Sequence, residues 1–168
     1  MTDTSLLITD GTFNESKAIH PEFNAVVSIK PHCLISTKNA LPSLTEIEGD
    51  SDPDLGGPAY LASARCICLY KNNDVFDFAI AYLCLDTDFK NPEWVDDFSD
   101  TIPNVSGWMY LHALDTLNKI ENKPSVFPVL AISQYCSGEL KVTRYNSQQE
   151  LDVAQSTVLG WIPLPESE

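Results

Sequence analysis

Runs of β-branched, aromatic and other apolar residues mark three strand-forming regions along the chain. The first, residues 24–37, is interrupted by Pro31, which has no N–H to donate, so we expect a bent strand or two strands there. The second is a hairpin pattern, in which residues 60–70 and 75–85 are joined by a turn of Asn and Asp at 71–74. Its second arm is almost wholly apolar, which predicts a central strand covered on both faces.

The third strand-forming region, residues 126–145, contains an apolar run, a turn and then an alternating arm. In that arm Leu140 and Val142 point to one side, while Lys141 and Thr143 point to the other. This alternation is typical of a half-buried strand. The region therefore predicts a second hairpin.

Three short helices are predicted. Ser106 is placed to cap a helix over residues 107–120, whose apolar residues recur at helical spacing. Residues 91–98 begin with Asn-Pro-Glu, the order expected of an N-cap, a first helical position and a first-turn acid. Residues 147–156 form the third candidate. Together with the hairpins, these elements predict an α+β fold with a mostly antiparallel sheet and two or three short helices.

Residues 38–58 are rich in Pro, Gly and acidic side chains, which predicts a flexible loop. The length of 168 residues suits one domain with a core of its own. We expect an N-terminal α+β region over residues 1–105, which contains this loop, and a C-terminal region over residues 106–168. Both belong to one compact domain in this interpretation.

The charge balance narrows the possible functions. The chain has 24 Asp and Glu against 10 Lys and Arg, which gives a formal net charge of −14. Binding to nucleic-acid phosphates or to an anionic membrane needs clustered Lys and Arg, so we expect neither as a direct partner. The first residues lack the basic region of a signal peptide, and no apolar run approaches the roughly 18–20 residues that cross a bilayer. A cytoplasmic location is therefore predicted.

The cysteine residues also agree with a cytoplasmic location. They are odd in number and most lie in apolar segments, and Cys66 and Cys68 would share one face of a strand. This usage is typical of free thiols in a reducing cytosol. The five are Cys33, Cys66, Cys68, Cys84 and Cys136.

No motif for catalysis or metal binding is complete. Residues 6–12 are similar to the Asp-x-Asp-Gly-Thr signature of haloacid-dehalogenase-type phosphatases, but Ile8 stands where the nucleophilic carboxylate is required. A candidate calcium loop from Asp50 has Leu55 in place of the required Gly and Leu61 in place of the bidentate Glu. We therefore expect no enzymatic activity, cofactor or metal. A site assembled from distant residues stays an open alternative.

Acidic residues gather in two short windows. The first holds Glu46, Glu48, Asp50, Asp52 and Asp54. The second holds Asp86, Asp88, Glu93, Asp96, Asp97 and Asp100, with Trp94 among them. These twelve residues are the candidate partner-binding residues. Either they form a solvated surface that keeps the protein soluble, or their carboxylates steer a basic partner that Trp94 anchors.

The last third of the chain resembles a family of phage and prophage proteins known as domain of unknown function 551. The matching stretches are Gly107-Trp108, residues 128–131, residues 138–145 and the closing segment 160–166, which reads Gly-Trp-Ile-Pro-Leu-Pro-Glu. The closing segment is the most specific of them. The resemblance implies an origin in a phage or mobile element, and it brings no catalytic residues.

These observations together predict a non-enzymatic accessory protein of a phage or mobile element. In the cytoplasm of a bacterial host it would bind and inhibit a basic host protein, and a nucleic-acid-binding defence factor fits because carboxylates can imitate DNA phosphates. One alternative is an immunity protein that neutralises a basic nuclease toxin. Another is an enzyme or small-ligand binder whose site is not visible in the sequence.

Overall fold

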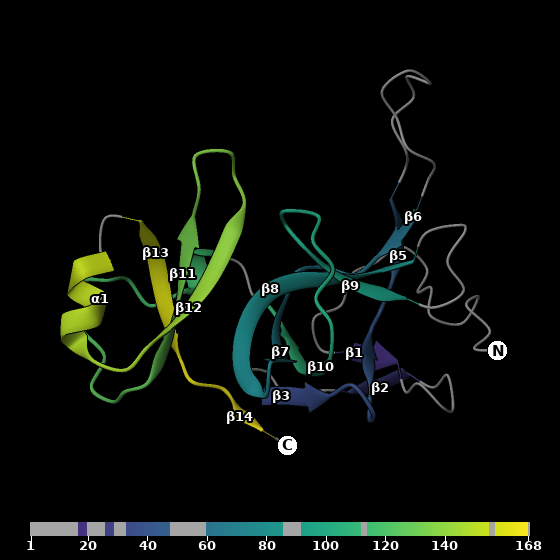
Figure 1. Ribbon diagram of the computed structural model, residues 1–168, viewed down its shortest axis with the longest axis horizontal. Coiled ribbons are helices and arrows are strands. Elements are labelled where there is room, and N and C mark those ends of the chain that lie inside the picture. Colours follow the sequence, from purple (N-terminus) through teal and green to yellow (C-terminus); the bar gives the residue numbers. More distant parts are fainter. Residues whose placement is uncertain are drawn as a thin grey trace.

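The structure is a computed structural model that describes residues 17–19, 26–28, 33–47, 60–85, 92–111, 114–154 and 157–167. This part of the chain is mostly β (Figure 1). It contains an eight-stranded mixed sheet, two three-stranded antiparallel sheets, one short α-helix and one 3-10 turn. The predicted antiparallel hairpins are therefore confirmed, whereas the helical share is smaller than an α+β fold requires.

The eight-stranded sheet forms the centre of the fold. Its strands follow the order β14-β3-β10-β7-β8-β6-β5, and β9 also pairs with β8. The pairing of β14 with β3 is parallel and the other pairings are antiparallel. The strands are β3 (Cys33–Ser36), β5 (Thr45–Ile47), β6 (Tyr60–Ala62), β7 (Cys66–Asn72), β8 (Val75–Leu85), β9 (Glu93–Asp96), β10 (Val105–Tyr110) and β14 (Glu166–Ser167).

The predicted hairpin at residues 60–85 is present, and its turn has a clear local cause. Asn73 and Asp74 both have positive φ angles, 47° and 67°, and Asn72 pairs with Val75 across the turn. Two successive residues with positive φ form the type I′ turn that matches the twist of the strands, and Asn and Asp tolerate this conformation. The prediction of a central, covered strand is confirmed only for the second half of β8. Residues 81 and 84 have strand neighbours on both edges, whereas residues 75–77 are exposed.

The second predicted hairpin is also confirmed, as part of a sheet with the order β12-β11-β13. Leu140 and Val142 are buried and Lys141 is exposed. The predicted helix at 147–156 appears as α1 (Gln148–Ala154). The sheet consists of β11 (Val129–Gln134), β12 (Leu140–Tyr145) and β13 (Val158–Pro163).

A smaller sheet of order β2-β1-β4 contains β1 (Lys17–Ile19), β2 (Val26–Ser28) and β4 (Leu41–Pro42). Strands β2 and β3 show that the apolar segment around Pro31 makes two strands rather than one. Pro31 itself lies outside the described residues.

Two of the predicted helices are wrong, because buried positions on both faces of the sheet outweigh the local capping signals. The segment 91–98 contains β9, and the segment 107–120 begins inside β10, with a 3-10 turn at Leu114–Thr116. In β10 the successive residues Trp108, Met109 and Tyr110 are all buried. Only an extended strand between two layers places neighbouring side chains in cores on opposite sides.

The predicted loop at 38–58 is also wrong at its beginning. Residues 41–42 and 45–47 are strands, and Leu44 between them is fully buried. The indole N–H of Trp108 donates to the carbonyl of Ala40 at 2.8 Å, and the hydroxyl of Tyr110 accepts from the N–H of Ser43 at 3.0 Å. These bonds fix the segment onto the sheet. Residues 48–58 lie outside the described residues.

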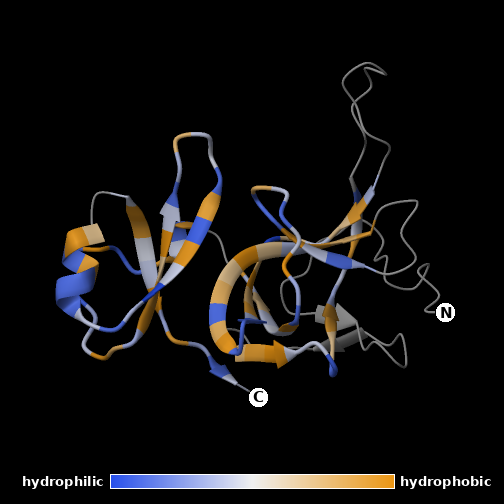
Figure 2. Ribbon diagram, in the orientation of Figure 1, coloured by the Kyte–Doolittle hydropathy of each residue, from blue (hydrophilic) through white to orange (hydrophobic). Residues whose placement is uncertain are grey.

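Three apolar cores separate the layers. One core, which includes Trp108 and Leu83, lies on one face of the large sheet under residues 40–44. The second lies between the large sheet and the β12-β11-β13 sheet, where Ile67 and Ile80 meet Leu130. The third lies between the β12-β11-β13 sheet and α1, around Leu151. Figure 2 shows the result, with β8 largely hydrophobic and α1 largely hydrophilic.

The first residues of the predicted C-terminal region, 106–110, form part of the large sheet in β10, and its last strand, β14, joins the same sheet. The parts of the chain at 1–105 and 106–168 thus share one sheet. In the part of the chain that the structure describes, no helix has the length and apolar character needed to cross a membrane.

Candidate functional site

A groove of about 500 Å³ lies between β8 and β12, and we call it the β8 groove. It has two strand walls, residues 77–80 of β8 and residues 140–144 of β12. The β12 wall carries two basic side chains, Lys141 and Arg144. Aromatic, acidic and aliphatic side chains from the neighbouring elements complete the groove. They are Tyr70, Asp96, Phe98, Ile102 and Tyr135.

The groove follows an edge of β8 that has no strand partner among the described residues. In an antiparallel ladder the backbone groups of successive residues point alternately to the two sides. The two-residue turn makes Asn72 and Val75 a hydrogen-bonded pair, so residues 75, 77, 79 and 81 bond β7. The backbone groups of Phe76, Phe78 and Ile80 therefore point to the other edge. There the pairing of Ala81 with Asp96 runs through Ile80, whose C=O faces the N–H of Asp97, so only Phe76 and Phe78 of these three have no strand partner among the described residues.

A hydrogen bond supports this assignment of the β8 edge. The N–H of Phe78 donates to the carboxylate Oδ1 of Asp77 at 2.8 Å, so it is not directed at β7. Similarly, β12 is the outer strand of its sheet, and the N–H of Leu140 donates to Oδ2 of Asp97 at 2.9 Å. Each wall of the groove thus has an outward N–H that is covered by a carboxylate. Such cover protects an open strand edge from uncontrolled pairing.

Two carboxylates gather with a tyrosine on one face of β8. Tyr70 is the cross-strand partner of Asp77. Asp96 is the cross-strand partner of Ala81, which lies on the same face of β8 as Asp77. Burial, then Asp77 and then Asp96 raise the pKa of the Tyr70 hydroxyl, in agreement with the position of the two carboxylates on its face of the sheet. The face beside the open edge is therefore negative and carries an aromatic ring.

The opposite face of β8 is apolar where it borders the groove. Phe78 and Ile80 point to this side and pack in the core that also contains Leu140 and Val142. A strand lying along the open edge would have alternate side chains on these two faces, one acidic and one apolar.

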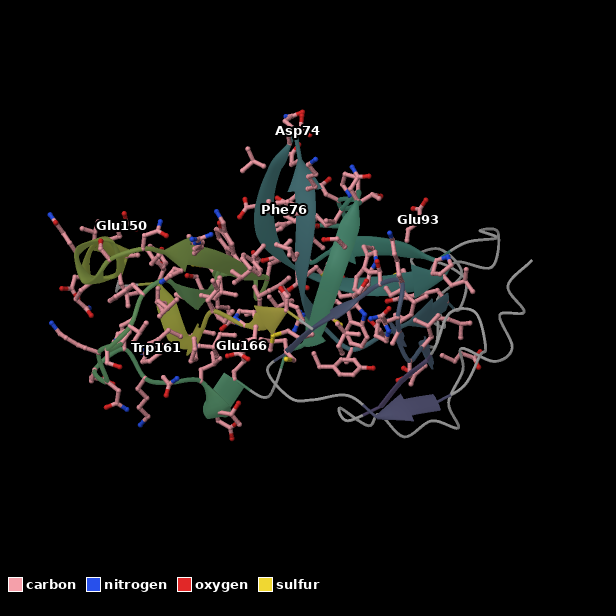
Figure 3. The ribbon with its side chains drawn as sticks, turned by 90° about the horizontal axis from the view of Figure 1, so that it is seen from below. Asp74, Phe76, Glu93, Glu150, Trp161 and Glu166 are labelled. Carbon is pink, nitrogen blue, oxygen red and sulfur yellow. The ribbon has the colours of Figure 1, made fainter. Side chains whose placement is uncertain are left out.

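Exposed aromatic rings lie in the groove and on the hairpin beside it. Phe98 and Tyr135, 49% and 47% exposed, form an edge-to-face pair with ring centroids 5.4 Å apart. Phe76, 59% exposed, and Asp74 lie on the protruding tip of the β7–β8 hairpin (Figure 3). There Lys71 forms an ion pair with Asp74 at 2.8 Å. Exposed aromatic side chains beside acids are suited to a protein partner.

The carboxylate of Asp97 is buried and has a structural role. Its side chain is only 2% exposed, and its Oδ1 accepts from Nε of Arg65 at 2.9 Å. Since its other oxygen accepts from Leu140, this carboxylate connects the large sheet with β12.

The other predicted partner-binding residues divide into three groups. Trp94 is 8% exposed and packs in the core, so its ring does not anchor a partner on the surface. Asp96 lines the groove, and its Oδ1 also accepts from the N–H groups of Phe98 and Asp100 at 2.9 Å. Glu46, Glu93 and Asp100 are exposed. Glu48, Asp50, Asp52, Asp54, Asp86 and Asp88 lie outside the described residues.

Sequence reasoning missed Tyr70, Asp77 and Tyr135. A signal for Asp77 was present, because it is the one charged residue in the apolar run 75–85. A carboxylate in a central strand has to reach an edge or a groove. The position of Tyr135 opposite Phe98 had no such signal, since it depends on how the two sheets pack.

Three of the five thiols are made less reactive by burial, and the described residues form no cluster suited to a metal ion. Burial raises the pKa of the thiols of Cys66 and Cys68, and it raises the pKa of Cys84 to about 11, which disfavours the reactive thiolate. Among the described residues, no three His, Cys, Asp or Glu side chains lie together as metal ligands do. His20, His32 and His112 lie outside that part of the chain.

In comparisons with protein-family models, with curated proteins and with solved structures, nothing matched this chain. The resemblance of the C-terminal third to domain of unknown function 551 therefore stays a prediction, and the site is interpreted from its own residues.

Proposed function

We propose that this chain is a non-enzymatic binding protein whose target is a basic protein, and that it inhibits that target by occupying its basic surface. The observation that carries the proposal is the pairing of Asp77 and Asp96 with exposed aromatic rings along one groove. Carboxylates attract and orient a basic partner, and aromatic rings provide contact area at low cost in conformational entropy.

The whole chain supports the same partner class. Its net charge of −14 gives a negative field that speeds the approach of basic proteins and repels nucleic acid. With the phage-like C-terminal pattern, this favours a host protein in the bacterial cytoplasm, such as a nucleic-acid-binding defence factor. A basic nuclease toxin has the same surface chemistry, and the identity of the captured protein decides between the two.

Affinity capture from bacterial lysate tests the proposal. The chain is immobilised, the retained proteins are identified by mass spectrometry, and elution is followed as salt rises. We expect retained proteins to be basic and to elute as the salt concentration rises, because screening weakens exposed charge pairs.

Two matched double variants test whether capture depends on the carboxylates of the groove. Asp77→Asn with Asp96→Asn removes two charges from the groove while each side chain keeps an acceptor oxygen. Asp115→Asn with Glu121→Gln removes two charges from exposed residues outside the groove lining. The groove pair should lose the partner and the control pair should keep it. Retention of acidic proteins, or equal retention by both variants, would contradict the proposal.

A further inference from the structure

We propose that the partner contributes an extended basic segment that binds as an added strand on the open edge of β8. The inference rests on the proposed function and specifies its binding mode. The occupant is a segment of the partner in which Lys or Arg alternates with apolar residues.

The backbone supplies the first part of the evidence. Phe76 and Phe78 direct their N–H and C=O groups to an edge that no described strand occupies, while β9 already pairs with β8 along the same edge at residues 81–84, a pairing that also engages Ile80. An added strand would continue the position of β9 along β8. Strand addition of this kind obtains its affinity from main-chain hydrogen bonds.

The size of the groove and the side chains that line it indicate what kind of segment would bind there. The groove of about 500 Å³ is in the range of cavities that hold ligands. Successive side chains of a bound strand alternate between the two faces of the sheet, and those two residues apart are about 6.6–6.8 Å from each other along the strand. On one face they meet Tyr70, Asp77 and Asp96, and on the other they meet Phe78 and the β12 wall, which also carries Lys141 and Arg144. Basic side chains fit the first face by ion pairing and by contact with the Tyr70 ring, and apolar side chains fit the second.

Asp77 acts in two ways in this binding mode. Without the partner, its Oδ1 holds the N–H of Phe78 at 2.8 Å and covers the edge. When a basic side chain of the partner pairs with Asp77, the N–H of Phe78 becomes available to a carbonyl of the added strand. The edge is therefore opened by a segment of the correct charge, and an acidic or neutral segment meets a covered edge.

The test uses the full chain and a synthetic peptide, acetyl-Arg-Val-Arg-Val-Arg-Val-amide. Binding is followed by NMR, with hydrogen exchange of the backbone amides. We expect the amide of Phe76 to become protected in the complex, while those of Asp77 and Ala79, already bonded to β7, change little. A peptide in which Glu replaces Arg should not bind.

Two sets of variants separate strand addition from charge attraction. N-methylation of the peptide at its Arg or at its Val positions removes the N–H groups on one side, and at least one of these two peptides should bind at least tenfold more weakly. Asp77→Asn with Asp96→Asn should weaken binding of the parent peptide about tenfold, as expected for two exposed ion pairs. Asp115→Asn with Glu121→Gln should weaken it less than twofold.

The outcomes distinguish the inference from the proposed function. If both N-methylated peptides bind as tightly as the parent, or if the amide of Phe76 gains no protection, strand addition is overturned. If basic proteins are nevertheless captured through Asp77 and Asp96, the proposed function stands without it. If the groove variant retains the captured proteins, the proposed function fails, whatever the peptide does.

Discussion

Replacing Asp97 with Ala should weaken the contact between the large sheet and β12. The carboxylate is 2% exposed and accepts two hydrogen bonds at 2.9 Å, from Arg65 and from the N–H of Leu140. A hydrogen bond to a charged group contributes about 1.5–3 kcal/mol. The Arg65 side chain is 47% exposed, so its ion pair contributes only about 0.2–1 kcal/mol. We therefore expect Asp97→Ala to lower the free energy of unfolding by about 2–4 kcal/mol.

Urea unfolding followed by circular dichroism and tryptophan fluorescence measures this change. Arg65→Ala is the matched control, because it removes the ion pair and leaves the bond to Leu140 in place. It should lower the unfolding free energy by about 1 kcal/mol or less. In the double variant, the loss should be close to that of Asp97→Ala alone, because the ion pair can be lost only once.

Hydrogen exchange at Leu140 provides an independent readout of Asp97→Ala, since its N–H loses the acceptor that the structure shows. If Asp97→Ala and Arg65→Ala have the same small effect, and the Leu140 amide exchanges as slowly as before, Asp97 does not connect the sheets and the reasoning is refuted.

Three further predictions concern the core and the thiols. Gly160→Ala should lower the free energy of unfolding, measured in urea, by about 1–3 kcal/mol, because the added Cβ would lie 2.6 Å from a side-chain carbon. Gly107→Ala is the matched control: its Cβ would have no neighbour closer than 3.7 Å, so it should be neutral or raise the free energy of unfolding by up to about 1 kcal/mol. Equal effects of the two variants would contradict the packing around Gly160. Cys136, which is exposed, should react with a thiol reagent at once, and buried Cys66 only on unfolding; early modification of Cys66 on mass spectrometry would show an open core. Because burial raises the pKa of Cys84 from 9.0 to about 11, the unfolded chain loses this proton first, so the unfolding free energy should fall between about pH 9 and 11. Cys84→Ala should reduce that slope, and an unchanged slope would assign it to other groups.

The parts of the fold that could be predicted from the sequence have local causes. The β7–β8 hairpin follows from Asn73 and Asp74 in positive φ, and β12 follows from the alternation of Leu140 and Val142 with polar residues. The helix predicted at 107–120 also had local signals, yet it does not form. The contact that decides this segment joins Trp108 to Ala40, which is 68 positions away.

The candidate site could be predicted only in part for the same reason. Asp96 was identified because acidic residues cluster near it in the sequence. Asp77 was missed, although it could have been found because it interrupts an apolar run. Their association with Tyr70 depends on which strands are neighbours, and the position of Tyr135 beside Phe98 depends on the packing of two sheets. Neither is encoded within a short window of residues. Net charge predicted the class of partner but not the surface that would meet it.

The parallel pairing of β14 with β3 has a consequence for the time course of folding. Glu166 and Ser167 pair with Cys33 and Leu34, so the sheet joins segments more than 130 positions apart. During synthesis, that edge of β3 stays without its partner until residues 166 and 167 have emerged from the ribosome. Contacts of such long sequence separation slow folding. The nascent chain therefore passes through a period in which an apolar strand edge is uncovered and open to chaperones.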